Sequence, residues 1–343
     1  MRLTHEVITV HTRHPFVIAR GGSSEYRVIR VTVTDDDGAN GWGEAAPNRF
    51  YGESVESVEA ALARFAPLLE SADPWALEDA EAAMDAAAGR NGSAKSAVSA
   101  ALHDLCAKRL GVPLYRLWGL NPSKAPRSSF TIAIAADAAE LEQRLEEAAD
   151  YPILKIKLGT DRDADVVRTV RRVAPDKTLR VDANAAWTAK HALRMIDVLV
   201  DHGVELVEQP VPAHDVDGLR YVRERSTLPV IADESCVTAV DVPRLVGAVD
   251  GINIKLSKCG GLREALRMIA TARAHGLLVM AGCMVETSLG ITAAAHLAPL
   301  LDFADLDGAA LLRDDPYLGA TIDRGIIRIP DGPGLGVTVR RRG

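Results

Sequence analysis

Five short apolar runs between residues 150 and 260 each end in a charged residue. These residues are Lys157, Asp182, Glu208, Asp233 and Lys255, and the intervals between them are 25, 26, 25 and 22 positions. An interval of this size accommodates one strand and one helix, so each charge would end one strand of a repeating unit. Parallel strands joined by helices bring their carboxyl ends to one edge, which in a barrel is the rim where active sites form. The spacing therefore predicts one barrel rim that carries five charged side chains.

Eight runs in the later part of the chain have the composition of buried strands, with helical patterns between them. The runs are residues 130–134, 153–157, 179–182, 205–208, 230–233, 252–255, 277–280 and 303–307. Alternation of this kind indicates an α/β fold with parallel strands and crossover helices. Eight units predict a TIM-type (β/α) barrel, which we assign to residues 126–317.

The first third of the chain is organised differently. Apolar and polar residues alternate through residues 1–45, and an Ala-rich helical stretch runs from Ser54 to about residue 120. Ser54 is a residue type that commonly caps the start of a helix. We expect an α+β domain over residues 1–125, completed by the β-like C-terminal tail, residues 318–343.

Composition excludes several classes of protein. The chain has 343 residues and a formal net charge of −7, and its first basic tract is the terminal Arg340-Arg341-Arg342. That tract is too short to form a nucleic-acid surface. No run approaches the roughly 18 apolar residues of a membrane helix, and no apolar signal segment is visible. We therefore expect a cytoplasmic protein that has neither a nucleic-acid nor a membrane partner.

Three of the five rim residues are carboxylates, which indicates a metal site. Asp182, Glu208 and Asp233 would repel one another if they met at one rim without a cation. A divalent ion resolves this conflict, and oxygen ligands without His or Cys favour Mg²⁺ over zinc. Lys157 and Lys255 would lie on the second and sixth strands, which face each other across an eight-stranded ring. Two opposed bases suit proton removal from one face of a substrate and proton return to the other.

The motifs around these positions resemble those of the muconate-lactonising subgroup of the enolase superfamily. The motifs are K-I-K at 155–157, V-D-A-N at 181–184, V-E-Q-P at 207–210, A-D-E-S at 232–235 and N-I-K-L-S-K-C-G-G at 253–261. The resemblance extends along essentially the whole chain. It implies a barrel with an N-terminal capping domain and one Mg²⁺ per subunit, in a site that stabilises an enediolate.

The same resemblance implies a role for each motif residue. Asp182, Glu208 and Asp233 would be the metal ligands, Lys157 and Lys255 the bases, and Lys155 a contact to the substrate carboxylate. Asn184, Glu234 and Lys258 would support the site from beside these residues.

The eighth strand resembles that of one family within this subgroup, the dipeptide epimerases. Asp305-Leu306-Asp307 matches their D-x-D motif, whose carboxylates hold the α-ammonium of the N-terminal residue. Asp305 and Asp307 would point to the same side of a strand. The segments 282–288 and 49–54 also resemble Ala-Glu epimerases. They add Cys283, Met284, Glu286 and Tyr51 as expected substrate contacts.

A loop near the N-terminus supplies a further expected contact. Arg20 is followed by Gly21 and Gly22, which suit a mobile lid, and it could pair with an acidic substrate side chain. The sequence departs from some relatives at Phe50, where they carry an arginine. The preference for an acidic second residue therefore remains open at this point.

The resemblance implies an isomerase, an epimerase of L-Ala-D/L-Glu-type dipeptides that acts in peptidoglycan peptide metabolism. Its partner would be a small dipeptide, and we expect a homo-oligomer. Three other reactions of the same site stay open: N-succinylamino acid racemisation, o-succinylbenzoate synthesis and muconate cycloisomerisation. A catalytically silent barrel that binds a metal or ligand is the alternative from another class.

Overall fold

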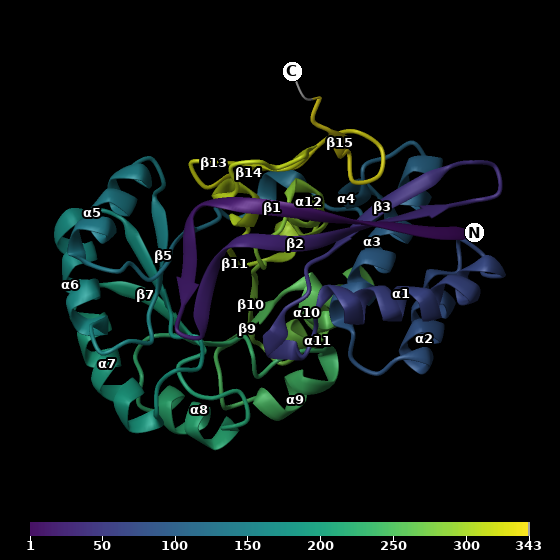
Figure 1. Ribbon diagram of the computed structural model, residues 1–343. Helices are drawn as coiled ribbons and strands as arrows, with labels where there is room; N and C mark the ends of the chain where they lie inside the picture. The colour runs from purple at the N-terminus through teal and green to yellow at the C-terminus, as the bar shows by residue number, and fades with distance from the viewer. Residues whose placement is uncertain (342–343) are drawn as a thin grey trace.

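The computed structural model describes residues 1–341. Its N-terminal part contains an antiparallel sheet of order β1-β2-β3, followed by helices. The elements are β1 (Arg2–Ile18), β2 (Gly21–Thr34), β3 (Asn40–Ala45), α1 (Val55–Glu70), α2 (Leu77–Ala87), α3 (Gly92–Arg109) and α4 (Leu114–Leu117). The long β1–β2 hairpin reaches over the barrel, and its tip lies near the barrel strands (Figure 1). The sequence pattern predicted this α+β arrangement.

Local signals explain two features of this part. Ser54 caps α1, and its hydroxyl accepts a hydrogen bond from the backbone of Ser57, as the sequence predicted. Helix α3 packs on β3 with almost no gap, because Gly41 and Gly43 have no Cβ. A Cβ at Gly41 would collide with the carbonyl of Ala101. The small residues of β3 and α3 therefore let backbone meet backbone at the centre of this layer.

The second part is the predicted barrel. Over the described residues, eight parallel strands follow one another in chain order, from β4 to β11. They are β4 (Phe130–Ile132), β5 (Ile153–Lys157), β6 (Thr178–Asp182), β7 (Val204–Glu208), β8 (Val230–Ala232), β9 (Gly251–Ile254), β10 (Leu278–Ala281) and β11 (Phe303–Ala304). A parallel bridge between Ser128 and Ala304 joins the first strand region to the last and closes the ring. The last strand is shorter than the expected 303–307.

Helices follow the barrel strands along the chain, and most of them lie around the outside of the barrel (Figure 1). They are α5 (Ala138–Glu147), α6 (Asp163–Val173), α7 (Ala189–Asp201), α8 (Val216–Arg223), α9 (Val242–Leu245), α10 (Leu256–Cys259), α11 (Leu262–Ala274) and α12 (Ser288–Ala295). The short α9 follows β8, which explains why the interval from Asp233 to Lys255 is the shortest of the four. No described helix has both the length and the apolar character needed to cross a membrane.

The C-terminal tail touches both parts of the molecule. Its strands are β12 (Tyr317–Leu318), β13 (Thr321–Asp323), β14 (Ile326–Arg328) and β15 (Thr338–Val339). The backbone of Leu335 donates to the carboxylate of Asp104 on α3 at 2.7 Å. On the barrel side, the backbone of Ser128 donates to the carbonyl of Gly325 at 2.8 Å. Residues 342 and 343 of the expected tail lie outside the described residues.

Candidate active site

The strand register brings the predicted carboxylates to one level of the barrel rim. Lys157 is the sheet partner of Asp182, and Asp182 is the sheet partner of Glu208. Asp233 follows β8 directly. Asp182, Glu208 and Asp233 are buried, and each offers an oxygen that lies within 4.8 Å of the others. Three neighbouring strands thus deliver three carboxylates to one point.

The donor set at this point suits a hard divalent cation. It consists of carboxylate oxygens alone, which is the chemistry that Mg²⁺ prefers. Glu208 Oε1 accepts a hydrogen bond from the side-chain amide of Asn253 at 2.8 Å, and Glu208 Oε2 lies 2.7 Å from the amine of Lys155. Two of the three buried carboxylates thus already attract one cation, the Lys155 ammonium, and the oxygens of all three are close enough together to share another. Asp182, Glu208 and Asp233 can therefore hold a metal ion.

The two predicted bases lie beside the outer members of this trio. Lys157 Nζ is 2.6 Å from Asp182 Oδ2, and Lys255 Nζ is 2.6 Å from Asp233 Oδ2. The strands β5 and β9 are four apart in the ring of eight, so the two lysines come from opposite sides. Both side chains also line the large cavity above the rim. The structure thus brings Lys157 and Lys255 together with the carboxylates, as their sequence positions predicted.

Lys155 is buried among the carboxylates of the rim. Its amine lies 2.7 Å from Asp305 and from Glu208, and 3.3 Å from Asp182. Burial opposes the charged form, but these carboxylates outweigh it and raise the pKa of Lys155 well above its ordinary value. Lys155 is absent from the described residues that line the cavity. In this structure it serves as a fixed cation between Asp305 and two of the metal-site carboxylates, Asp182 and Glu208.

The carboxylates of the rim differ in their preferred charge. Burial raises the pKa of Asp182 and Asp233, but the lysines beside them outweigh burial and hold both pKa values below the ordinary range. Burial, together with repulsion from Asp182, raises the pKa of Glu208 to about 7. Burial lowers the pKa of Lys255, but Asp233 and Glu208 outweigh this effect and raise it. The lysines therefore hold Asp182 and Asp233 as anions, whereas Glu208 binds a proton more readily.

The D-x-D aspartates lie in the cavity wall and are held by β4. The hydroxyl of Ser129 donates to Asp305 at 2.7 Å, and the backbone of Thr131 donates to Asp307 at 2.6 Å. Lys155 outweighs burial and lowers the pKa of Asp305, whereas burial and the charge of Asp305 raise the pKa of Asp307 to about 7. Ser129 and Thr131 were not predicted. Their signal is two small polar residues at alternate positions of the first barrel strand.

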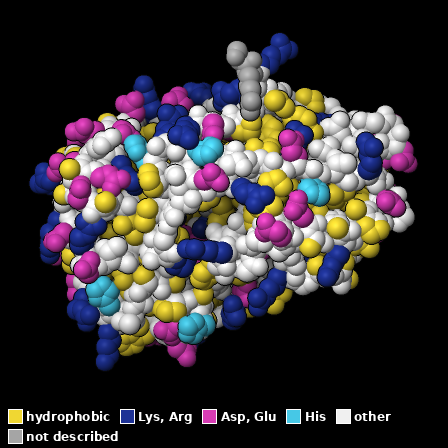
Figure 2. Space-filling view, in the orientation of Figure 1, with side chains coloured by type: hydrophobic (Ala, Val, Ile, Leu, Met, Phe, Trp, Pro, Cys, Tyr) yellow, Lys and Arg dark blue, Asp and Glu magenta, His cyan; other side chains and the backbone are white. Residues whose placement is uncertain are grey.

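A cavity of about 730 Å³ lies between the barrel mouth and the N-terminal part. The predicted residues that line it are Arg20, Tyr51, Lys157, Asn184, Glu234, Lys255, Cys283, Met284, Asp305 and Asp307. Figure 2 shows the surface hollowed near the centre of this face, with Lys and Arg side chains at the edge. The cavity brings together loops that lie far apart in the sequence.

Glu286 lies elsewhere, so its expected contact with the substrate needs correction. Its buried carboxylate accepts a hydrogen bond from the backbone of Met284 at 2.8 Å, and it faces Gly290. The carboxylate thus holds the 283–286 turn together from within, and it is not among the described cavity-lining residues. The direction of a loop side chain depends on the turn, which strand or helix periodicity does not supply.

Two supporting residues act on the metal-site aspartates. Lys258 Nζ donates to Asp233 at its side chain (2.8 Å) and its carbonyl (2.6 Å), and to the carbonyl of Asn253 at 2.8 Å. The backbone of Asn184 donates to Asp182 Oδ1 at 2.8 Å. These contacts fix the positions of both aspartates.

Arg20 connects the hairpin tip to the barrel. Its guanidinium donates to the carbonyl of Asn184 at 2.6 Å and lies 2.7 Å from Glu234 Oε1. It also stacks on Phe50, with 4.3 Å from the guanidinium carbon to the ring centre. Burial, with repulsion from Asp233 and Asp182, raises the pKa of Glu234 although Lys255 and Arg20 oppose this. Arg20 already has an anionic partner, so an acidic substrate side chain would share it with Glu234.

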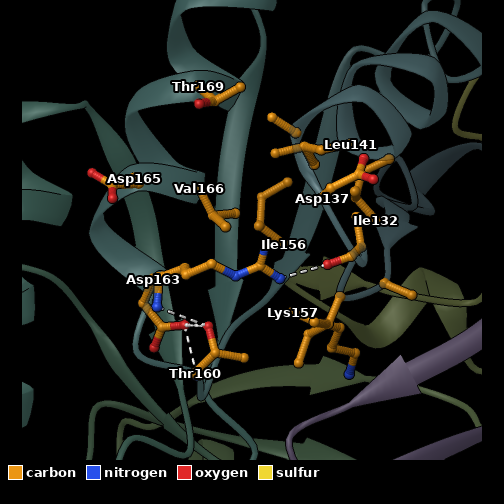
Figure 3. Close-up of a pocket in the computed structure, with 15 residues that line it drawn as sticks. Ile132, Asp137, Leu141, Ile156, Lys157, Thr160, Asp163, Asp165, Val166 and Thr169 are labelled. Atoms are coloured by element: carbon orange, nitrogen blue, oxygen red, sulfur yellow. Dashed lines mark hydrogen bonds between the residues drawn. The ribbon is translucent and has the colours of Figure 1, made fainter.

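A second cavity, of about 130 Å³, lies on the outer side of the barrel between α5 and α6. Figure 3 shows its apolar wall of Ile132, Leu141, Ile156 and Val166, with the Lys157 amine turned away from it. Its polar groups are satisfied internally, since Asp163 accepts from the backbone and hydroxyl of Thr160. We interpret this space as a gap between strands and helices.

Two family models match the chain. The model described as "Enolase C-terminal domain-like" matches residues 136–343, and the model of the mandelate racemase/muconate lactonizing enzyme N-terminal domain matches residues 2–119. These matches cover the barrel and the N-terminal part. The chain belongs to the mandelate racemase/muconate lactonizing enzyme family of the enolase superfamily.

Individual relatives are similar over nearly their full lengths. The L-Ala-D/L-Glu epimerase of Bacteroides thetaiotaomicron is 41% identical over 338 residues, which cover 98% of this chain and 88% of the relative. The dipeptide epimerase of Enterococcus faecalis complexed with Mg and L-Leu-L-Tyr has a TM-score of 0.93 and 33% identity, covering 98% and 99%. The N-succinyl Arg/Lys racemase of Bacillus cereus has a TM-score of 0.91 and 28% identity, covering 99% and 96%.

Proposed function

We propose that the protein is a Mg²⁺-dependent dipeptide epimerase that inverts the α-carbon of the C-terminal residue in dipeptides of the L-Ala-D/L-Glu type. One observation carries the proposal: Asp305 and Asp307 line the same cavity as Lys157 and Lys255. One small molecule can therefore present its ammonium group to the aspartates and its α-carbon to the lysines. The relatives named as dipeptide epimerases support this substrate class.

The proposed chemistry is proton transfer between two lysines. Lys157 and Lys255 approach from opposite sides of the ring, because their strands are four apart. One amine, when neutral, removes the α-proton, and the other, when protonated, returns a proton to the opposite face. The α-carbon inverts without a covalent intermediate. Asp305 and Asp307 orient the dipeptide by accepting hydrogen bonds from its ammonium group.

The Mg²⁺ would be held by Asp182, Glu208 and Asp233. When bound, it would neutralise the negative charge that develops on the substrate carboxylate. It would also weaken the ion pairs between these three residues and the lysine amines. Lys155 would add a fixed positive charge close to the same carboxylate. We propose that Arg20, Tyr51, Cys283 and Met284 contact the dipeptide side chains, because all four line the cavity.

The closest rivals are other reactions of the same site. N-succinylamino acid racemisation is supported by the similarity to the Bacillus cereus racemase. o-Succinylbenzoate synthesis and muconate cycloisomerisation are the others. None of these three reactions needs an ammonium-binding pair, so Asp305 and Asp307 favour the dipeptide. A catalytically silent barrel would have no need for two opposed lysines at the rim.

A dipeptide library incubated with the enzyme and Mg²⁺ in D₂O tests the proposal. Mass spectrometry should show that one deuteron is incorporated into dipeptides with a free N-terminus, and chiral chromatography should show the second epimer. A parallel set of N-succinylated amino acids is the control. Exchange confined to the N-acylated set would favour the racemase, and absence of exchange from both sets would favour the silent barrel.

The expected homo-oligomer and the cytoplasmic location stay predictions. Light scattering on the purified protein measures the oligomeric state, and cell fractionation measures the location.

A further inference from the structure

Gln209 follows the metal-site residue Glu208 and is fully buried. Its side chain makes four hydrogen bonds. Oε1 accepts from the backbones of Asp233 (2.9 Å) and Ser235 (3.1 Å), while Nε2 donates to the carbonyl of Val211 and to Ser235 Oγ, both at 2.8 Å. Every hydrogen-bonding position of the amide is therefore occupied, with both acceptor bonds at the end of β8.

The backbone of Gln209 joins the same strands from the other side. Its N–H donates to the carbonyl of Ile231 on β8 at 2.8 Å, and its carbonyl accepts from the N–H of Ala185 at 2.8 Å. Ala185 follows β6, the strand that ends at Asp182. One residue thus connects the ends of β6, β7 and β8, which are the three strands that carry the carboxylate trio.

The conformation of Gln209 shows that these contacts hold it in place. Its φ is +34°, in the left-handed region that residues with a Cβ avoid. Asn184 and Ala185, which follow Asp182, also have positive φ values of 45° and 64°. Such conformations persist where surrounding contacts determine them, and they cluster at functional sites.

We propose that Gln209 is a positioning residue of the metal site, which sets the placement of Glu208 and Asp233 through its amide. The amide contacts the backbone of Asp233 but none of the three carboxylates. It therefore acts by holding the ligand residues in place and does not itself bind the metal. The inference rests on the proposed metal site and does not depend on a dipeptide as the substrate. Partners that orient metal ligands typically change metal affinity by 10- to 100-fold when they are removed.

Mn²⁺ binding to purified variants, followed by electron paramagnetic resonance, tests this inference. Gln209→Met keeps the side-chain length but removes all four hydrogen bonds, and it should weaken Mn²⁺ binding by about 10- to 100-fold. Gln143→Met changes the chain's other glutamine, on the exposed face of α5, and should leave binding unchanged. Val170→Ala on α6 is a second control, because it lowers the thermal stability from a buried site away from the ligands.

Weaker Mn²⁺ binding in Gln209→Met than in a Val170→Ala protein of similar Tm supports the positioning role. Equal Mn²⁺ affinity in Gln209→Met and the wild type overturns it. If Gln209→Met does not fold, Ser235→Ala takes its place, since it removes one acceptor of the amide. A weakening of about 2- to 10-fold then supports the role, and unchanged affinity overturns it. A wild-type protein that binds no Mn²⁺ would instead refute the metal site itself.

Discussion

Two regions of this protein bury carboxylates, and they neutralise them by different means. At the barrel rim, Asp182 and Asp233 each lie 2.6 Å from a lysine amine. Where the N-terminal sheet meets α12, Glu44 accepts hydrogen bonds from the backbone and hydroxyl of Thr287. Glu286 lies next to it, since both carboxylates face Gly290, where a Cβ would overlap them. Over residues 1–341, neither glutamate takes part in an ion pair.

The pKa values follow from this difference. The lysines outweigh burial at the rim and lower the pKa of Asp182 and Asp233. Where no ion pair forms, burial raises the pKa of Glu44 to about 8, with the charge of Glu286 adding to it. Burial raises the pKa of Glu286 to about 7, although the charge of Lys255 opposes this. A buried carboxyl group is thus held as an anion where a lysine pairs with it, as in Asp182 and Asp233, and binds a proton more readily where no ion pair forms, as in Glu44 and Glu286. Replacing a carboxylate by its amide should separate the two cases.

The largest effect is expected from removing charge at the rim. Asp233→Asn should lose at least about 10²-fold in kcat/KM, because the metal site loses an anionic ligand and Lys255 loses its partner. Asp182→Asn and Glu208→Gln should behave alike. EDTA should abolish the wild-type activity, and Mg²⁺ should restore it. Turnover that survives exhaustive chelation would rule out the metal assignment. Glu44→Gln, the same change in the other region, should keep its activity.

The next largest effect is expected from replacing the two rim lysines, Lys157 and Lys255. Lys157→Ala and Lys255→Ala should each lose net epimerisation by about 10²- to 10⁴-fold, because each breaks the proton relay. Each variant should retain some α-proton exchange with solvent for one epimer only, through the remaining lysine. NMR of each pure epimer in D₂O measures this exchange. A variant that interconverts epimers near the wild-type rate would show that its lysine is not a base.

The rim could be predicted because its signals are local. Each charge ends an apolar run, and strand alternation then directs Lys157 and its counterparts to one side. The observed β5 has the predicted bounds, residues 153–157. Gln209 lies within a motif whose glutamate was interpreted, yet its own role depends on contacts to β6 and β8. Such contacts have no signature in the strand pattern.

The region where the N-terminal sheet meets α12, with Glu44, Glu286 and Thr287, could not be predicted for a related reason. Glu44 belongs to a strand whose alternation shows a buried side but not what covers it. Its partner Thr287 is 243 positions away. Arg20 was expected to meet a substrate, and it lines the cavity; the structure adds a partner that the sequence did not show, Glu234, because the hairpin tip rests on the barrel. Docking of one part on another depends on shape, which a single sequence does not display.

A smaller effect is expected at the D-x-D aspartates. If they bind the ammonium, N-acetylation of the dipeptide should lower kcat/KM by roughly 10- to 150-fold, the equivalent of about 1.5–3 kcal/mol for one charge-assisted hydrogen bond. Asp307→Asn should lower kcat/KM for the free dipeptide. It should therefore reduce the ratio of kcat/KM for the free dipeptide to kcat/KM for the acetylated dipeptide. Steady-state kinetics on the acetylated and free dipeptides measures both. An N-acylated substrate that turns over better than the free one would favour the racemase.

The smallest effect is expected on the stability of the folded protein, through the buried Glu44 where the N-terminal sheet meets α12, and it depends on pH. The pKa of Glu44 is about 8 in the folded protein, above the value of a glutamate in the unfolded chain. Between about pH 4.5 and 8 the folded state therefore holds a proton that the unfolded state releases, so stability is greatest at the acidic end and falls as pH rises. Glu44→Gln keeps an acceptor for Thr287 and cannot ionise. The free energy of unfolding of Glu44→Gln, measured by chemical denaturation, should fall less steeply from pH 5.5 to 8.5 than that of the wild type. The two slopes should differ by on the order of 1 kcal/mol per pH unit at most. Glu25→Gln, at an exposed position of β2, is the matched control and should follow the wild type. Other buried acids titrate in the same range, so the quantity to measure is the difference in the free energy of unfolding between Glu44→Gln and the wild type. If the two proteins gave parallel curves of this free energy against pH, Glu44 would already be ionised in the folded protein.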